Sequence, residues 1–198
     1  MAVLIRLAAA EDAAAIAAIY RPYVEQSRIS FEEAAPDAAE MARRMTQQAG
    51  LYPWFVAVED GQVLGYSASA PFRTRPAYRW TVETSVYLAA EACGRGIGSA
   101  LLAPLLSLLE RQGYVAAIGA IALPNPASIR MHEKHGFIHT GTYRQVGFKM
   151  AEWLDVGLWE KDLAPRHAAP AEPLPYAELF AEPIRCGSAF PAPPSPPP

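Results

Sequence analysis

The pattern of apolar and polar residues predicts strands and helices that alternate along the chain. Trp54 to Glu59 and Gln62 to Ala70 are apolar runs of strand length, and Asp60-Gly61 joins them. An Asp-Gly pair between two such runs is a strong signal for a tight turn between antiparallel strands. A hairpin is therefore expected here.

The periodicity elsewhere predicts an α/β domain. Further strands are expected at Val3 to Leu7, Thr81 to Leu88 and Tyr114 to Ala122, with two closing strands in Gly141 to Leu163. Helical spacing predicts helices at Glu11 to Tyr23, Asp37 to Gln48, Gly98 to Gln112 and Asn125 to Gly136. Asn125 suits a helix N-cap and Pro126 the first turn, whereas Pro104 should kink its helix.

The strand expected at Thr81 to Leu88 has one polar face. Side chains alternate along a strand, so one face carries Glu83, Ser85 and Tyr87, and the other carries Val82, Thr84, Val86 and Leu88. The polar face is the natural place for chemistry.

Charge and length exclude several classes of protein. The chain of 198 residues has 17 Lys and Arg against 20 Asp and Glu, without a basic stripe, so we expect no nucleic-acid partner. Its apolar N-terminal stretch is too short to span a membrane and does not resemble a signal peptide, so we expect a cytoplasmic protein without a membrane partner. The two cysteines, Cys93 and Cys186, imply no disulfide framework.

Proline divides the chain at residue 164. Of the 19 prolines, 11 fall within residues 165–198. We therefore expect one domain over residues 1–164 and a proline-rich tail over 165–198 that is extended or disordered. A polyproline segment that binds a partner is the alternative for this tail.

A glycine-rich loop, Cys93-Gly94-Arg95-Gly96-Ile97-Gly98, lies between a predicted strand and a predicted helix. Backbone N–H groups in such a loop converge on an anion at the helix N-terminus. A Rossmann loop would follow the first strand of a βαβ unit, and a Walker loop would end in Gly-Lys-Ser/Thr. Neither fits, which leaves a diphosphate-bearing cofactor of another kind.

With these features, the chain resembles the GNAT superfamily of N-acetyltransferases over residues 3–163, and within it the phosphinothricin and methionine-sulfoximine acetyltransferase branch. The motifs that carry the resemblance are Ala77 to Glu83, Leu123 to Asn125, Ser128 to Glu133 and Trp153 to Trp159. It implies a mixed central sheet with two splayed parallel strands flanked by helices, and acetyl-CoA as co-substrate without a metal.

The resemblance also implies the cofactor contacts. The residues expected to bind acetyl-CoA are Val86, Tyr87, Leu88, Arg95, Gly96, Ile97, Gly98, Ser99, Asn125 and Ser128. Cys93 replaces the Gln or Arg usual at the start of the loop, which should weaken but not abolish binding, because backbone amides hold the phosphates. A redox or nucleophilic Cys93 is a lesser alternative.

Glu83 is the candidate general base for the acceptor amine. An α-amine titrates near about pH 8 and a model Glu near about 4.3, so Glu83 would act through water or with a raised pKa. The alternative is that Glu83 only pairs with Arg79 or with another cation across the cleft.

His132 stands where many GNAT enzymes have a tyrosine that donates to the departing sulfur. Histidine can donate a proton near neutral pH, so His132 is the second catalytic candidate, with a packed helix residue as its alternative. A zinc site of His132, His135 and His139 is weaker, because no cysteine or carboxylate cluster accompanies them.

The residues expected at the acceptor are Phe31, Tyr78, Arg79 and Lys149. Arg79 is the best placed to hold a carboxylate or phosphinate, whereas Arg73 and Arg75 fit solvated loop charge. Trp153 and Trp159 are expected to be structural, at a core or dimer contact.

The resulting prediction is transfer of an acetyl group from acetyl-CoA to the amine of a small amino-acid-like acceptor, such as phosphinothricin, methionine sulfoximine or methionine sulfone, by a homodimer. A protein N-terminus is the alternative acceptor. A degenerate acetyl-CoA sensor is the alternative outside the enzymes.

Overall fold

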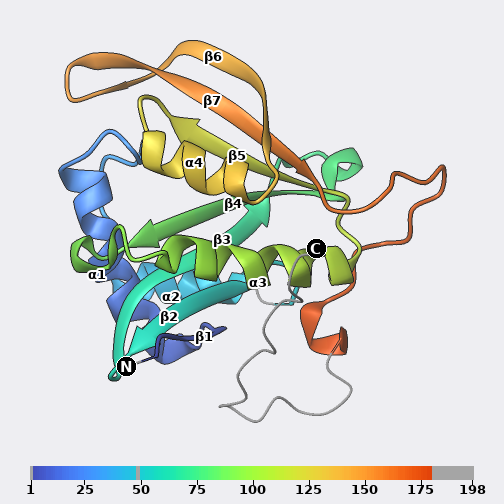
Figure 1. The fold of residues 1–198 in the computed structure, drawn as a ribbon, viewed down its shortest axis with the longest axis horizontal. Coiled ribbons are helices and arrows are strands. Elements are labelled where there is room, and N and C mark those ends of the chain that lie inside the picture. Colours follow the sequence, from blue (N-terminus) through green and yellow to red (C-terminus); the bar gives the residue numbers. More distant parts are fainter. Residues whose placement is uncertain (1, 48–49, 180–198) are drawn as a thin grey trace, which may run out of the picture.

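The computed structural model describes residues 2–47 and 50–179, and over these ranges seven strands form one mixed sheet (Figure 1). The strand order is β1-β2-β3-β4-β5-β7-β6. The strands are β1 (Leu4–Leu7), β2 (Trp54–Glu59), β3 (Gln62–Pro71), β4 (Thr81–Leu88), β5 (Ala116–Ala122), β6 (Ile138–Lys149) and β7 (Glu152–Asp162). Every strand expected from the sequence is present.

The predicted hairpin joins β2 to β3 through Asp60 and Gly61. Both residues have positive φ angles, 51° and 79°. A two-residue turn of this hand matches the twist of the flanking strands, and a glycine adopts such angles without strain.

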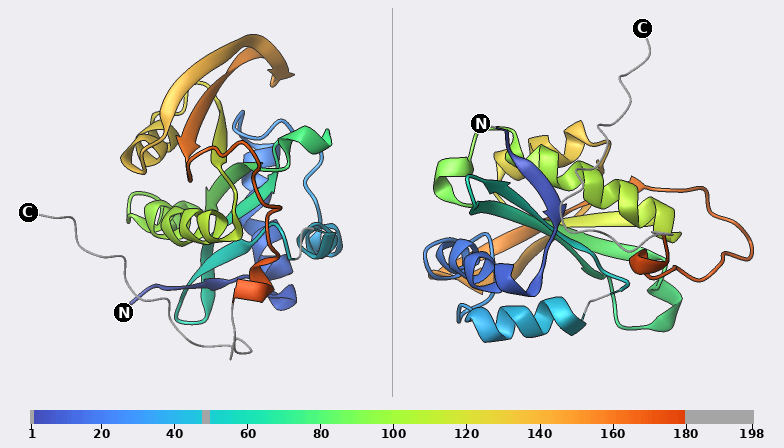
Figure 2. Two further views of the ribbon diagram at one scale, coloured as in Figure 1. Left: turned by 90° about the vertical axis from the view of Figure 1, so that its right-hand side faces the viewer. Right: turned by 90° about the horizontal axis from the view of Figure 1, so that it is seen from below.

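Helices cover both faces of the sheet (Figure 2). On one face lie α1 (Ala13–Glu25), which follows a short 3-10 turn, and α2 (Ala38–Gln47). On the other lie α3 (Ile97–Gln112) and α4 (Pro126–Lys134). The predicted leucine stripe of α3 is buried, and the helix runs on through Pro104 to Gln112.

The sheet opens between β4 and β5, the neighbouring strands that run parallel. Their register pairs run from Thr81 with Ala116 to Glu83 with Ile118 and then stop within the described residues. The β3–β4 ladder, by contrast, continues to Leu88. The predicted splayed pair of parallel strands is therefore confirmed, and Glu83 lies at its apex.

Part of the segment after residue 164 contacts the domain. Trp80 donates its indole N–H to the carbonyl of Ala171 (2.7 Å), and the side-chain amide of buried Gln112 donates to the carbonyl of Leu174 (2.8 Å). The structure therefore places residues 171–179 against the end of α3 and the start of β4. Residues 180–198, with Cys186 and the last proline run, lie outside the described residues.

Within the described ranges, the search for a helix both long and apolar enough to cross a membrane finds none.

Candidate active site

Glu83 projects from the face of β4 that α1 covers further along the strand. Tyr87, on the same face, packs edge-on against Tyr20 and Tyr23 of α1, with ring centroids 4.8 and 5.0 Å apart. Val82, on the opposite face, belongs to the core beneath α3. The predicted division of β4 into two faces is thus present in the fold.

The surroundings of Glu83 favour its neutral form. Burial raises the pKa of the Glu83 carboxyl, and the positive charge of Arg73 opposes that rise only in part. The alternative pairing with Arg79 is wrong, because the Arg79 guanidinium lies 2.7 Å from the carboxylate of Glu172 and stacks on Trp80. A carboxyl with a raised pKa is a better match for an amine proton than an ordinary glutamate.

The glycine-rich loop presents backbone amides at the start of α3. Gly94 and Gly96 both have positive φ, and Gly96 is the N-cap without a side-chain cap. The first intrahelical bond is donated by Ala100 to Gly96 (3.1 Å), so the earlier amides of the first turn, those of residues 97–99, require an outside acceptor. This geometry suits a pyrophosphate.

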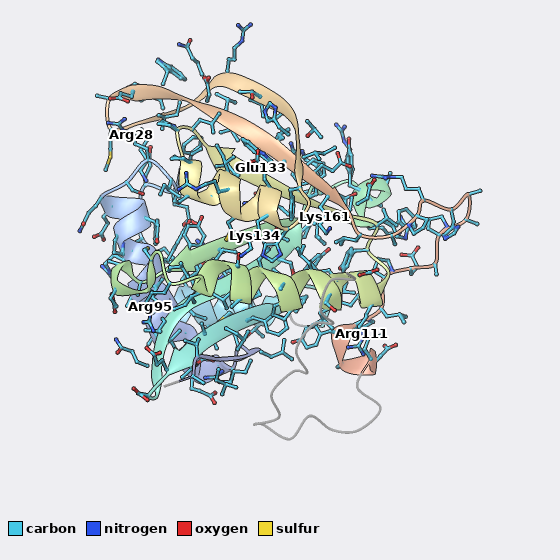
Figure 3. The ribbon with its side chains drawn as sticks, in the orientation of Figure 1. Arg28, Arg95, Arg111, Glu133, Lys134 and Lys161 are labelled. Carbon is cyan, nitrogen blue, oxygen red and sulfur yellow. The ribbon has the colours of Figure 1, made fainter. Side chains whose placement is uncertain are left out.

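Two side chains of the glycine-rich loop have contacts within the protein. Arg95 pairs with Glu59 at 2.8 Å, and Cys93 is exposed, with its sulfur 3.6 Å from the carbonyl of Ala89. Figure 3 shows Arg95 at the same end of the molecule as Arg28, where β4 and β5 end. The groups of the loop that remain open to an anion are therefore mainly backbone amides.

Fewer residues of β4 have backbone groups open to a ligand than the sequence predicted. Ala89 donates its N–H to Leu64 of β3, so by alternation the amide groups of Tyr87 also face β3, and those of Val86 face the opening. Leu88 faces the opening too, but the Tyr23 hydroxyl donates to its carbonyl at 2.7 Å. Among the three predicted residues, Val86 is therefore the one whose backbone groups face the opening and are not taken by Tyr23, a contact that the sequence analysis missed.

His132 is buried on α4, only 3% exposed, and faces β5. Its Nδ1 lies 2.8 Å from the carbonyl of Ser128, which can only accept, so Nδ1 carries the proton. Its Nε2 is buried without a hydrogen-bond partner among the described residues. Burial lowers the pKa of His132, so at neutral pH the ring is uncharged and Nε2 is an acceptor rather than the expected proton donor.

Close packing against glycines sets the position of α4. A Cβ added to Gly119 of β5 would lie 2.7 Å from Nε2 of His132, and one added to Gly98 of α3 would lie 2.9 Å from the sulfur of Met131. Asn125 caps α4 as predicted, with its side-chain oxygen accepting from the N–H of Ser128 at 3.1 Å. Gly98, Asn125 and Ser128 therefore have structural contacts of their own.

The three histidines that a zinc site would require each contact different parts of the protein. His135 lines a cavity with residues of α3, whereas His139 packs on Trp159 and lies 3.0 Å from the hydroxyl of Thr142. His132, as described above, lies over Gly119. Their contacts are those of packed side chains.

Lys149 does not face an acceptor site. Its ammonium group donates to the carbonyls of Val24 (2.6 Å), Ser30 (2.5 Å) and Glu32 (2.9 Å), so all three donors are used. The predicted role in binding an anion is wrong. Lys149 instead ties β6 to the loop between α1 and α2.

The other predicted acceptor residues differ in their fit. Phe31 lies over Gly147 of β6, where an added Cβ would meet its ring, and it stays 40% exposed beside the site. Tyr78 packs edge-on against Phe72. Arg79 is held by Glu172, so the cation that acts on Glu83 is Arg73, which the sequence analysis had assigned to solvated loop charge.

A cavity of about 290 Å³ lies between the α1–α2 loop and the end of β5. It was not predicted, since its walls come from three distant parts of the chain. The lining residues are Gln26, Ser27, Arg28, Ile29, Ala122, Leu123, Pro124 and Met150.

Comparison with known proteins identifies acetyltransferases similar to this chain. Residues 5–158 match the family model described as the acetyltransferase (GNAT) domain. Phosphinothricin N-acetyltransferase of Streptomyces viridochromogenes is 38% identical over 86% of this chain and 91% of its own length. The L-methionine sulfoximine/L-methionine sulfone acetyltransferase of Salmonella typhimurium is 35% identical over 84% of this chain and 97% of its own.

A solved structure gives the same likeness in three dimensions. The phosphinothricin acetyltransferase of Sinorhizobium meliloti in complex with acetyl-CoA matches with a TM-score of 0.83 and 38% identity, covering 89% of this chain and 99% of that one.

Proposed function

This chain belongs to the GNAT acetyltransferase family, and on that premise we propose that it transfers the acetyl group of acetyl-CoA to the amino group of a small amino-acid-like acceptor. The observation that carries the proposal is the end of the β4–β5 ladder at Glu83, where the two central strands separate beside a carboxyl with a raised pKa. The relatives named for phosphinothricin and methionine sulfoximine support an acceptor of that class.

Backbone groups hold the acetyl-CoA in this proposal. The first-turn amides of α3, from Ile97 to Ser99, take the pyrophosphate, and Gly94 and Gly96 give the loop its shape. The N–H and C=O of Val86 pair with the pantetheine arm in place of the β5 neighbour that β4 has lost. The contacts of Asn125 and Ser128 within α4 keep His132 over Gly119 of β5.

Glu83 promotes loss of the amine proton, directly or through a water. The neutral amine then attacks the thioester carbonyl carbon, the C–N bond forms, and the C–S bond breaks as the thiolate leaves. The proton that Glu83 removed before the attack passes to solvent, and the second proton, which the nitrogen loses as the amide forms, ends on the CoA sulfur. The bare Nε2 of His132 accepts a hydrogen bond from the resulting thiol.

Arg73 takes the role first given to Arg79 at the acceptor. Its charge reaches Glu83, so an acceptor with its amine at Glu83 can place its carboxylate on the Arg73 guanidinium. Phe31, fixed over Gly147, forms part of the acceptor wall.

A homodimer remains part of the proposal. The β6–β7 hairpin exposes large apolar side chains, which are Ile138, Tyr143, Val146, Phe148, Met150 and Trp153. A cluster of this kind is typical of a protein interface. Trp159, the other tryptophan of the motif, is buried in the core. Light scattering of the purified chain tests the dimer. The cytoplasmic location stays a prediction.

The proposed reaction is tested by thiol release from acetyl-CoA with phosphinothricin, methionine sulfoximine, methionine sulfone and unmodified amino acids, and by the mass of each product. An N-acetylated product with at least one of these acceptors is expected. Binding of acetyl-CoA without turnover over the whole panel would contradict the proposal and favour a protein acceptor or a sensor.

A further inference from the structure

The face of the sheet that carries Glu83 continues as a floor toward the end of β5. Ile118 lies directly opposite Glu83, and Ala120 and Ala122 follow on the same face because side chains alternate along a strand. Ala120 is exposed, and Ala122 lines the cavity beneath the α1–α2 loop. The cavity therefore opens on the face that holds the candidate base.

The position of this cavity suits the side chain of an acceptor. From the level of Ile118 to that of Ala122 the strand rises roughly 13 Å, whereas Val86 lies roughly 10 Å beyond Glu83 on β4. An acceptor whose amine lies between Glu83 and a thioester near Val86, and loses its proton to Glu83 through water, can thus direct its side chain toward Ala122. Ile29, Leu123 and Met150 give the cavity apolar walls for the methylene groups of such a side chain.

Contacts between the α1–α2 loop and the β6–β7 hairpin hold the walls of the cavity in place. The α1–α2 loop meets the β6–β7 hairpin through the Lys149 ammonium group, through the ring of Phe31 on Gly147 and through an ion pair between Arg28 and Glu152. Three different kinds of contact therefore keep the α1–α2 loop against the hairpin. Of the three contacts, the ion pair is the one that includes a residue lining the cavity, Arg28.

Arg28 brings a positive charge to the cavity, and its partner Glu152 holds a negative charge beside it. Nη1 of Arg28 lies 2.6 Å from Oε2 of Glu152, and both side chains are about half exposed. Arg28 also lines the cavity, so its remaining N–H groups are donors at the rim. An uncharged sulfone or sulfoximine can accept from Arg28, whereas an anionic phosphinate also meets the negative charge of Glu152.

We propose that this cavity receives the side chain of the acceptor, and that the Arg28–Glu152 pair sets the enzyme's preference between side chains with an anionic end and side chains with an uncharged polar end. The inference rests on the proposed function and adds its specificity. The negative charge of Glu152 weakens the binding of an anionic acceptor side chain and the positive charge of Arg28 strengthens it. Removing one charge or the other should therefore have opposite effects.

The test compares kcat/KM for methionine sulfone and phosphinothricin in the natural chain, Arg28→Gln and Glu152→Gln. The ratio of phosphinothricin to methionine sulfone should rise about two- to five-fold in Glu152→Gln and fall by a similar factor in Arg28→Gln, as expected for half-exposed charges. The matched controls are Arg166→Gln and Asp162→Asn, which remove a similarly exposed ion pair on β7 and after it. They should leave the ratio unchanged.

The two proposals fail in different ways. Turnover that persists with the same acceptor ratio in both variants, or a ratio that moves in the same direction in both, would overturn the specificity inference and leave the acetyl transfer intact. A natural chain that acetylates neither acceptor nor any other amino acid would overturn both.

Discussion

Glu83 and Ile118 form the last register pair of the parallel ladder between β4 and β5. Beyond them β4 stays paired with β3 and β5 stays paired with β7, so the two central strands separate at a single carboxylate. The opening that would admit the thioester and the group that would activate the amine are therefore set by the same pair of residues.

The raised pKa of Glu83 predicts where activity is lost in acid. Glu83 acts as a base only when ionised, and burial raises its pKa above the ordinary value of 4.5. As the pH falls, kcat/KM should therefore decline at a higher pH than an ordinary glutamate would cause. A pH–rate profile with methionine sulfone measures this limb, and a limb at or below 4.5 would contradict the burial that the structure gives to Glu83.

Lys149→Met should damage the acceptor side of the site and spare the cofactor side. The change leaves the carbonyls of Val24, Ser30 and Glu32 without their donor, at a cost of about 1–3 kcal/mol in unfolding free energy. We expect the KM for the acceptor to rise several-fold while the KM for acetyl-CoA stays constant. Lys134→Met, on exposed α4 surface, is the control; equal kinetics in the two variants would contradict the role given to Lys149.

Gly119→Ala tests the placement of His132. The new methyl group would lie 2.7 Å from the imidazole ring, so the ring must move and kcat should fall at least several-fold. Gly141→Ala is the matched control, because an added Cβ there meets nothing within 4 Å. Unchanged kcat in a folded Gly119→Ala variant would show that His132 has no part in the reaction.

Gln112→Leu should loosen the segment after the domain. The Gln112 side-chain amide donates to the carbonyls of Leu51 (3.0 Å) and Leu174 (2.8 Å) from a position that is 1% exposed. Its loss should lower stability by about 1–3 kcal/mol and speed proteolysis between residues 165 and 179. Denaturant unfolding and limited proteolysis measure both, with Gln62→Leu at the exposed start of β3 as the control.

The elements of the fold were predictable because their signals are local. Asp60-Gly61 marks the hairpin, the leucine spacing marks α3, and Asn125 with Pro126 marks the start of α4. The family motifs then predicted the splay of β4 and β5, which local periodicity alone does not encode.

The partners of long charged side chains were less predictable, because they depend on chain segments far apart in sequence. Lys149 meets carbonyls more than 100 residues away, and Arg79 meets Glu172 from the segment after the domain. Tyr23 reaches Leu88 across 65 residues in the same way. The backbone geometry followed the motifs more closely than the charged partners did, because Gly94 and Gly96 have positive φ and the β4–β5 ladder ends at Glu83.

The most direct test of the acetyl-transfer mechanism is the rate of thiol release for Glu83→Gln beside the natural chain, at saturating acetyl-CoA and with an acceptor that the natural chain acetylates. Glu11→Gln, an exposed change outside the cleft, serves as the control. We predict a fall in kcat of about 10²- to 10⁴-fold, the usual contribution of general base catalysis, with acetyl-CoA affinity retained. A Glu83→Gln variant that turns over at the natural rate would contradict the account.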